Sequence, residues 1–365
     1  MSKWKNCKLG DLGEIIGGAT PSTKNKSYYG GDVAWITPKD LSSCQSRFIH
    51  RGERNITREG LNSCSVRLMP PNSVLFTSRA PIGYIAIAEN EVCTNQGFKN
   101  IVPNADTDYL FLYYLLIHNR DKIENMGSGT TFKEVSGSVM KRINVFVPTD
   151  IGEQRSIARV LGSFDDKIEN NSVINHHLEQ IAQAIFVEQC SYGSRTLLSD
   201  ILTVCYGRDH KRLGDGEVPC YGSGGIMRYV DEAIYNGESV LIPRKGSLNN
   251  VLYINGPFWT VDTMFYTQMR YPNVAKLVYF TIRGLDLMGM NVGSAVPSMT
   301  ITVLNALEIM LPSDDLLASF EDIVSPMFMQ IQANNMESVR LAALRDILLP
   351  RLMSGELSVD DLDDV

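Results

Sequence analysis

The chain has 365 residues, enough for two or three domains with hydrophobic cores of their own. Its longest apolar run, residues 109–117, is only half as long as a membrane span, and no apolar signal-peptide stretch is recognised. Its seven cysteines form no C-x-x-C pair. We therefore expect a cytoplasmic protein with reduced thiols and without zinc, disulfides or a membrane anchor. The formal net charge is −7, but residues 1–150 carry +4 and residues 313–365 carry −8, so charge does not exclude DNA binding by the globular parts.

Residues 1–150 predict a first globular domain of short strands joined by polar loops. Five of these loops are rich in Gly or Pro and carry Arg, Lys, Gln, Asn, Ser or Thr: residues 17–23, 37–41, 78–84, 94–99 and 127–134. These are the side chains that read base edges and phosphates, although each loop alone is typical of an ordinary surface turn. The apolar run in this domain predicts a buried helix.

Residues 151–190 predict a long helix with a narrow apolar seam. Its apolar residues recur in steps of four, three and four, which is a heptad pattern. They are Ile157, Leu161, Phe164, Ile168, Leu178, Ile181 and Ile185. The seam from residue 157 to residue 185 spans 29 residues, about 44 Å at about 1.5 Å per residue. A helix with a single apolar stripe must bury that stripe against a partner.

The second half of the chain predicts the same elements again. Residues 191–313 form a second globular domain, with polar loops at residues 221–229, 243–250, 256–263 and 292–298. Residues 314–352 form a second long helix, and residues 353–365 an acidic tail. The seam of the second helix contains Phe320, Val324, Met327, Ile331, Leu341, Leu344 and Leu348.

Each seam position of the second helix follows its counterpart in the first by 163 positions. The globular domains repeat with weaker similarity: residues 126–148 match residues 290–312, and residues 72–87 match residues 238–254. We therefore predict an α+β protein in which two pseudo-repeated α/β domains are separated by two long helices that pair as an antiparallel coiled coil. Such a pair would act as a spacer between two related but different binding domains.

The repeat places two asparagines, Asn171 and Asn334, opposite each other in the seam. They are interpreted either as a solvated gap in the apolar stripe or as a polar pair that fixes the register of the helices. The sequence leaves both interpretations open.

We find no complete constellation for catalysis. Residues 222–227 lack the last glycine of a dinucleotide-binding loop, no Walker A motif is present, and the five histidines form no H-E-x-x-H motif. No cluster of carboxylates has the spacing of a nuclease. We therefore expect a binding protein without catalytic activity, metal or cofactor of its own.

Three stretches carry a resemblance to a known family: residues 153–171, residues 348–357, and residues 71–87 together with 94–98. In these stretches and in its plan of globule, helix, globule and helix, the chain resembles the specificity subunits of type I restriction–modification systems. The resemblance covers both halves, although the second domain has IPRKGS where the first has FTSRAPIG.

The resemblance implies that each globule is a target-recognition domain that reads one half of an asymmetric, bipartite site in double-stranded DNA. The two helices would set the unread spacer and dock two methyltransferase subunits, which hold S-adenosylmethionine and flip the target adenine. A translocase–nuclease subunit would join through the same core. The chain itself would be a non-catalytic DNA-recognition subunit.

Within the polar loops we select the side chains best suited to contact DNA. In the first domain these are Arg79, Gln96 and Lys133 for bases, with Lys39 and Thr130 for phosphate or base; in the second they are Ser223, Arg244, Lys245 and Ser294. Arg79 and Arg244 could equally be structural hydrogen-bond donors near their loops.

Two alternatives remain from the sequence. The chain could be the recognition subunit of a related type II system in which one fused partner cuts and methylates, with fold and role unchanged. It could also be a coiled-coil scaffold whose globules bind protein or sugar, which predicts no affinity for DNA.

Overall fold

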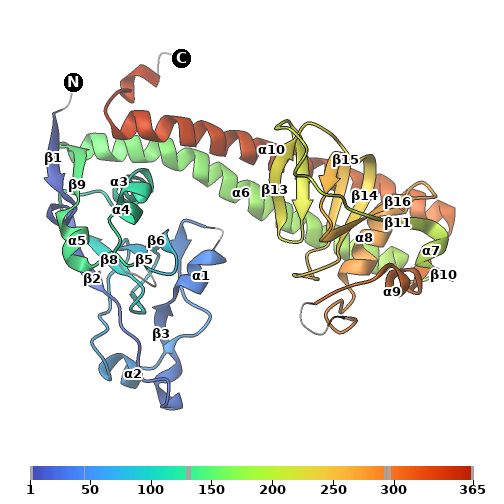
Figure 1. The fold of residues 1–365 in the computed structure, drawn as a ribbon, viewed down its shortest axis with the longest axis horizontal. Coiled ribbons are helices and arrows are strands. Elements are labelled where there is room, and N and C mark those ends of the chain that lie inside the picture. The colour runs from blue at the N-terminus through green and yellow to red at the C-terminus, as the bar shows by residue number, and fades with distance from the viewer. Residues whose placement is uncertain (1–2, 45, 129–132, 292, 294–296, 363–365) are drawn as a thin grey trace. The chain divides into compact units, whose positions relative to one another are not determined.

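The computed structural model describes residues 3–44, 46–128, 133–291, 293 and 297–362 (Figure 1). The chain divides into two compact units: the first comprises residues 1–173 and 334–365, and the second comprises residues 174–333. Each unit therefore contains one globular part and a portion of both long helices, whereas the predicted domain ranges separate helix from globule.

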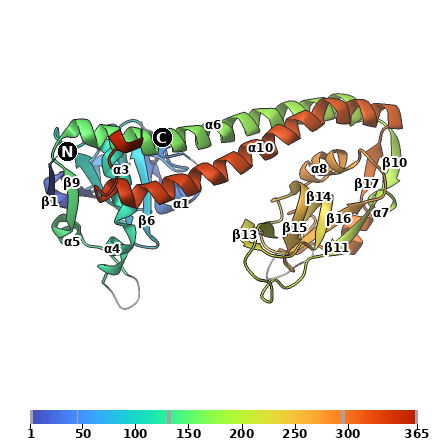
Figure 2. The ribbon, with the colours of Figure 1, turned by 90° about the horizontal axis from the view of Figure 1, so that it is seen from above.

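The two predicted long helices are confirmed. α6 (Ile151–Cys190) and α10 (Asp314–Met353) each have 40 residues, and both pairs of ends differ by the 163 positions of the sequence repeat. In the first unit α6 and α10 lie side by side (Figure 2), where Lys167 Nζ lies 3.3 Å from Glu337 Oε2 and Arg345 pairs with Asp165. Residue numbers rise along one helix as they fall along the other, so the helices are antiparallel.

The apolar seam is buried near the start of each helix and half-buried along most of the rest. Ile157, Leu161, Phe320 and Val324 are at most 1% exposed. The half-buried seam residues are Phe164, Ile168, Leu178, Ile185, Met327, Ile331, Leu341 and Leu348.

Two seam predictions are wrong: Ile181 is 49% exposed and Leu344 is 50% exposed. The next residue along each helix faces inward instead. Ala182 is fully buried, and Arg345 is turned toward Asp165. A straight helix has 3.6 residues per turn, so a strict seven-residue pattern drifts around it and the inward position moves to the next residue.

Asn171 and Asn334 form a polar pair rather than a solvated gap. Asn171 is 0% exposed and Asn334 is 5% exposed. The Asn171 amide Nδ2 donates to Glu337 Oε2 at 2.8 Å and reaches the Asn334 carbonyl at 3.4 Å. This hydrogen bond holds the pKa of the Glu337 carboxyl below its usual range.

The globule of the first unit is built on a five-stranded sheet with the order β2-β8-β5-β6-β4. Two strand pairs, β1–β9 (antiparallel) and β3–β7 (parallel), complete it. The strands are β1 (Trp4–Lys8), β2 (Gly13–Gly17), β3 (Tyr29–Ile36), β4 (Phe48–Ile49), β5 (Val74–Ser78), β6 (Ile82–Ala88), β7 (Val92–Thr94), β8 (Lys99–Pro103) and β9 (Asn144–Pro148). The helices are α1 (Pro38–Ser42), α2 (Arg58–Asn62), α3 (Tyr109–His118), α4 (Arg120–Asn125) and α5 (Gly137–Arg142).

The core of this globule is continuous with the long helices. α3 is the apolar run of the sequence; it packs on β5 and β6 and is mostly buried. Its core cluster also takes in Ile157 and Leu161 of α6 and Leu352 and Met353 of α10. After α10, Gly355 turns with φ +72° against the indole of Trp4, which a side chain on residue 355 would crowd. One core cluster therefore joins the first globule to its helix portions.

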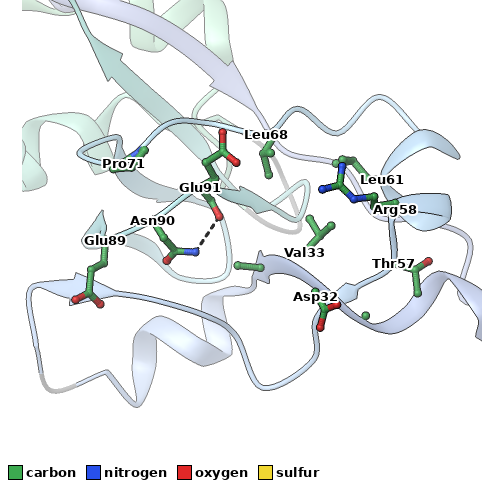
Figure 3. Close-up of a pocket in the computed structure, with 12 residues that line it drawn as sticks. Asp32, Val33, Thr57, Arg58, Leu61, Leu68, Pro71, Glu89, Asn90 and Glu91 are labelled. Atoms are coloured by element: carbon green, nitrogen blue, oxygen red, sulfur yellow. Dashed lines mark hydrogen bonds between the residues drawn. The ribbon is translucent and has the colours of Figure 1, made fainter.

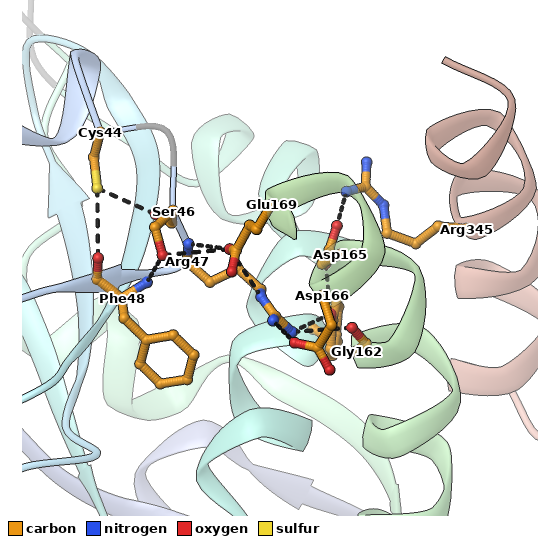
Figure 4. A network of polar contacts seen from close by, with 10 residues as sticks. Cys44, Ser46, Arg47, Phe48, Gly162, Asp165, Asp166, Glu169 and Arg345 are labelled. Atoms are coloured by element: carbon orange, nitrogen blue, oxygen red, sulfur yellow. Dashed lines mark hydrogen bonds and ion pairs between the residues drawn. The ribbon is translucent and has the colours of Figure 1, made fainter. Parts of the chain in front are cut away.

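A buried arginine fixes the first globule on α6 (Figure 4). Arg47 is 6% exposed; its Nε lies 3.2 Å from Glu169 Oε1, and its terminal nitrogen pairs with Asp166. Burial opposes the charge, but the bonds to Glu169 and Asp166 outweigh it and raise the pKa of Arg47. Tyr114 of α3 donates to Asp165 Oδ2 at 2.5 Å, and Arg345 of α10 pairs with the same carboxylate.

The globule of the second unit is built on a six-stranded sheet with the order β11-β16-β14-β15-β12-β13. A separate antiparallel pair joins β10 to β17. The strands are β10 (Ser194–Leu197), β11 (Leu202–Tyr206), β12 (Val218–Gly222), β13 (Gly225–Val230), β14 (Tyr235–Pro243), β15 (Leu252–Thr260), β16 (Met264–Met269) and β17 (Glu308–Leu311), and the helices are α7 (Leu198–Ile201), α8 (Ala275–Arg283) and α9 (Ile301–Asn305).

A buried lysine fixes this second globule on α10. Lys276 of α8 is 3% exposed, and its Nζ lies 2.9 Å from Glu238 and 2.5 Å from Glu321 of α10. Arg283, seven residues after Lys276 on α8, pairs with Glu179 of α6. Each globule is thus attached to the helices by a cation of its own.

The two sheets share a frame. The succession β2-β8-β5-β6 in the first unit corresponds to β11-β16-β14-β15 in the second, and the pair β1–β9 corresponds to β10–β17. The predicted α+β fold with two pseudo-repeated domains is confirmed by this shared order. The next strand also corresponds, because β4 pairs with β6 in parallel and β12 pairs with β15 in parallel. Beyond it the second sheet adds β13, and the first globule adds the separate pair β3–β7.

Candidate nucleic-acid interface

Three loops of the first globule meet where β5 ends and β8 begins. The Ser78 N–H donates to the Gly97 carbonyl at 2.7 Å, and the Val135 N–H donates to the Ser78 carbonyl at 3.0 Å. The backbone of Arg79 pairs with that of Glu134. Residues 78–80, 96–99 and 133–135 therefore lie together; we name them the first loop cluster.

One carboxylate holds two cations in this cluster. Glu134 Oε1 lies 3.2 Å from Lys99 Nζ, and Glu134 Oε2 lies 3.6 Å from the Arg79 guanidinium. Lys99 also reaches Ser78 Oγ at 3.3 Å. The Arg79 and Glu134 side chains are 36% and 38% exposed, whereas Lys99 is 15% exposed. Charge of both signs is therefore open to a ligand at this point.

Of the other predicted residues of the first globule, Gln96 and Lys133 belong to this cluster and Lys39 lies beside it. Gln96 accepts a hydrogen bond from Thr20. Lys39 is 76% exposed and pairs with Glu53 at 2.6 Å, so its charge is already matched. Lys133 is exposed. Thr130 lies outside the described residues.

Gly97 connects the cluster to α1. A side chain on residue 97 would come within 3.2 Å of Pro38 Cγ, so the start of α1 lies directly against the Gln96–Gly97 turn. α1 begins at Pro38 behind a capping box in which Thr37 and Asp40 bond reciprocally. This cap sets the position of Lys39 at the edge of the cluster.

The second globule has a loop cluster at the corresponding place. The Arg244 N–H donates to the Thr263 carbonyl at 2.8 Å, and the Met299 N–H donates to the Arg244 carbonyl at 2.9 Å. The backbone of Lys245 pairs with that of Ser298. We name residues 223, 244–246, 263 and 297–299 the second loop cluster.

The predicted residues of the second globule are described as follows. The Arg244 guanidinium donates to the Asp262 carbonyl at 3.1 Å and lies 5.2 Å above the ring of Tyr206. Lys245 is exposed. The carbonyl of Ser223 accepts from Asn250 Nδ2 at 2.9 Å. Ser294 lies outside the described residues.

The two clusters have matching backbone bonds. Ser78 N–H to Gly97 carbonyl in the first corresponds to Arg244 N–H to Thr263 carbonyl in the second. Arg79 therefore corresponds to Lys245, and Glu134 corresponds to Ser298. Both globules present a long cationic side chain at the same point of the same frame.

Sequence reasoning missed two members of the first loop cluster. Lys99 and Glu134 are the last residues of two predicted polar loops, 94–99 and 127–134, but neither is among the residues predicted to contact DNA. The signal that could have found them is the register of the repeat: residue 134 falls at the position of residue 298, beside residue 79. Their convergence depends on the pairing of distant segments.

A pocket in the first globule has a different character (Figure 3). It measures about 780 Å³ and lies between β3, α2 and the turns around Pro71 and Asn90. Asp32, Glu89 and Glu91 lie around it, with Arg58 as a single cation. The excess of carboxylates disfavours a phosphate ligand here.

Among the described residues, no group of three or more His, Cys, Asp or Glu side chains could hold a metal ion. No described helix is long and apolar enough for a membrane span.

A sheet frame that occurs twice in one chain, each time with cationic loops and with portions of the same two long helices, defines a class of protein with two related binding domains. The chain matches the family described as "Type I restriction modification DNA specificity domain" over residues 1–180 and 198–316. It belongs to this family.

Individual relatives agree with the family match. The chain is 33% identical to the type I restriction enzyme MjaIX specificity subunit of Methanocaldococcus jannaschii, over 98% of this chain and 94% of that one. It is 24% identical to the EcoprrI specificity subunit of Escherichia coli, over 84% and 82%. Its fold is similar to the crystal structure of a type I restriction–modification S subunit from M. genitalium, with a TM-score of 0.61, 18% identity and 96% of each chain covered.

Proposed function

We propose that this chain is the DNA-specificity subunit of a type I restriction–modification complex, and that its two globules read the two halves of an asymmetric, bipartite site. The observation that carries the proposal is the correspondence of Arg79 and Lys245 in two loop clusters built on the same backbone bonds. Arg and Lys bind the O6 and N7 acceptors of guanine in the major groove. Related frames with different side chains are suited to two different half-sites.

The exposed side chains of the helices favour contact with a protein partner over contact with DNA. In the first unit, four apolar side chains of α10 are at least half exposed: Met336, Val339, Leu344 and Ile347. An exposed apolar row of this kind favours contact with another protein over contact with phosphate. We propose that methyltransferase subunits dock on this row and on its counterparts, and that they, not this chain, hold S-adenosylmethionine and perform the methylation.

The function is tested by base-resolved mapping of methyladenine in plasmid DNA from cells that co-express this chain with its partner methyltransferase. The expected result is methylation at one split, asymmetric motif, which disappears when this chain is omitted. A stable complex that methylates no site would contradict the proposal and favour a scaffold role.

The docking surface is tested by co-purification of the methyltransferase with the variant Leu344→Asp/Ile347→Asp. A charge buried at the contact is expected to abolish the complex. Arg340→Gln on the same helix is the control, and it should leave co-purification unchanged. Undiminished binding of the double variant would place the methyltransferase elsewhere.

A further inference from the structure

The two loop clusters differ in their charged residues. In the first, Glu134 lies against both Arg79 and Lys99. In the second, the corresponding residue is Ser298, and Lys99 is replaced in the frame by Phe265, which is fully buried. The first cluster is therefore a mixed site with two cations and one carboxylate, whereas the second presents Arg244 and Lys245 without a corresponding carboxylate.

Glu134 retains capacity to accept a further hydrogen bond. A carboxylate has about four lone-pair directions on its two oxygens. Lys99 occupies one of them at 3.2 Å, and the guanidinium of Arg79 at 3.6 Å is an ion pair longer than a hydrogen bond. The Glu134 side chain is 38% exposed, so a base edge can reach it.

The surroundings fix the position of this carboxylate. The Glu134 backbone bonds to Ser128 in both directions, at 3.0 and 3.1 Å, and Val135 is tied to Ser78. The mostly buried Lys99 forms an ion pair with Glu134 Oε1. An acceptor held this firmly can discriminate between bases, because it does not turn away from a base that lacks a matching donor.

We infer that Glu134 is a specificity-determining residue of the first globule: it accepts a hydrogen bond from the exocyclic amino group of a cytosine or an adenine, next to the base read by Arg79. This inference rests on the proposed function in DNA recognition. Carboxylates are the side chains that accept from the N4 amino group of cytosine in the major groove. The second globule, with Ser298 at this position, reads its half-site without such a carboxylate.

The test uses the full chain in its complex with the methyltransferase and the same base-resolved methylation map. Glu134→Ser introduces the residue of the second globule, and Glu134→Gln keeps the size and one acceptor oxygen. In both variants, discrimination at one base of one half-site should fall about 5- to 150-fold, the range expected for one base contact. The other half-site should stay as it is.

Two further variants sharpen the result. Ser298→Glu should change one position of the other half-site only. Glu14→Ser is the matched control, because it removes an exposed carboxylate that pairs with Arg67. Glu14 lies on β2 opposite Val102, at the other end of β8 from Lys99, so the variant should leave the motif unchanged.

The outcomes separate the inference from the function on which it rests. If wild type yields no split motif, the function and the inference both fail. If wild type yields one and both Glu134→Ser and Glu134→Gln preserve every position, Glu134 makes no base contact, and the inference is overturned. Loss of methylation with Glu134→Ser alone, while Glu134→Gln relaxes one base, supports the inference.

Discussion

Lys276 gives the sharpest test of how a globule is attached to its helix. Its ammonium group is 3% exposed and lies within 3 Å of two carboxylates, Glu238 of the sheet and Glu321 of α10. Lys276→Met keeps the length of the side chain and removes the charge. Two carboxylates then face each other, and Glu321, which is 17% exposed, has little access to water.

The expected cost is about 3–5 kcal/mol, the range for breaking a buried ion pair on one side. The assay is hydrogen exchange of the second unit, read in peptides from α8 and α10. The opening equilibrium there should rise about 10²- to 10⁴-fold at pH 7. Adding Glu238→Gln and Glu321→Gln to Lys276→Met should restore most of the protection, because no unpaired charge then remains buried.

The pH dependence gives a second readout of the same site. Burial alone would raise the pKa of Glu238, but hydrogen bonds from Tyr253 and Lys276 outweigh it and lower that pKa below its ordinary value of 4.5. The stability from this carboxylate is therefore complete above about pH 4.5 and is lost as the pH falls through the lowered value. In Lys276→Met the hydrogen bond from Lys276 that lowers the pKa of Glu238 is lost, so that pKa rises. The deficit against wild type should therefore shrink between pH 7 and pH 4.

Two results would refute this reasoning. One is a Lys276→Met variant within about 1 kcal/mol of wild type at pH 7, which is the range of a solvated surface pair. The other is a deficit that stays constant as the pH falls, which would mean that the loss comes from packing over Tyr253 and Phe328 rather than from charge.

Two further predictions concern DNA recognition. Arg79→Ala should relax or weaken one half-site only, at about 1–3 kcal/mol for a lost guanine contact; methylation mapping checks it, and an equal loss at both half-sites would make Arg79 structural. Lengthening α6 and α10 together by insertion should change the unread spacer in the methylated motif and leave both half-sites intact, and an altered half-site would contradict the spacer role of the helices.

The long helices were predictable because their signals are local and repeated. A heptad seam needs only the spacing of apolar residues, and the offset of 163 positions gives the ends of α10 from those of α6. The prediction failed at Ile181 and Leu344, where the inward position has moved on by one residue. That shift follows from the 3.6 residues per turn of a straight helix, and in α10 it turns Arg345 toward Asp165.

The loop clusters were only partly predictable. The repeat aligned Arg79 with Lys245, and the backbone bonds of the structure show the same correspondence. Their roles on DNA stay predictions. The side-chain types taken to contact base edges and phosphates, Arg, Lys, Gln, Asn, Ser and Thr, do not include Glu. Lys99 and Glu134 meet because Ser78 at the end of β5 bonds both to Gly97, before β8, and to Val135, and spacing along the sequence does not encode such non-local pairing.

The attachment of the globules shows what the repeat does not share. The seam residues recur every 163 positions, but the carboxylates that hold the globules do not: Glu321 corresponds to Ala158, and Glu179 corresponds to Ala342. A globule moved from the second half of the chain to the first would therefore bring Lys276 against Ala158, which is 1% exposed in the first unit.

Such a graft carries an expected outcome. The buried ammonium group would lose its carboxylate on the helix, at about 3–5 kcal/mol, even though the apolar seam beneath it is equivalent. Introducing Ala158→Glu into the grafted chain should recover most of that loss, measured by hydrogen exchange over α8, and Ala158→Gln should recover much less. Equal recovery by both substitutions would show that shape, not charge, attaches the globule. The polar contacts, rather than the shared apolar seam, then determine which globule each helix portion accepts.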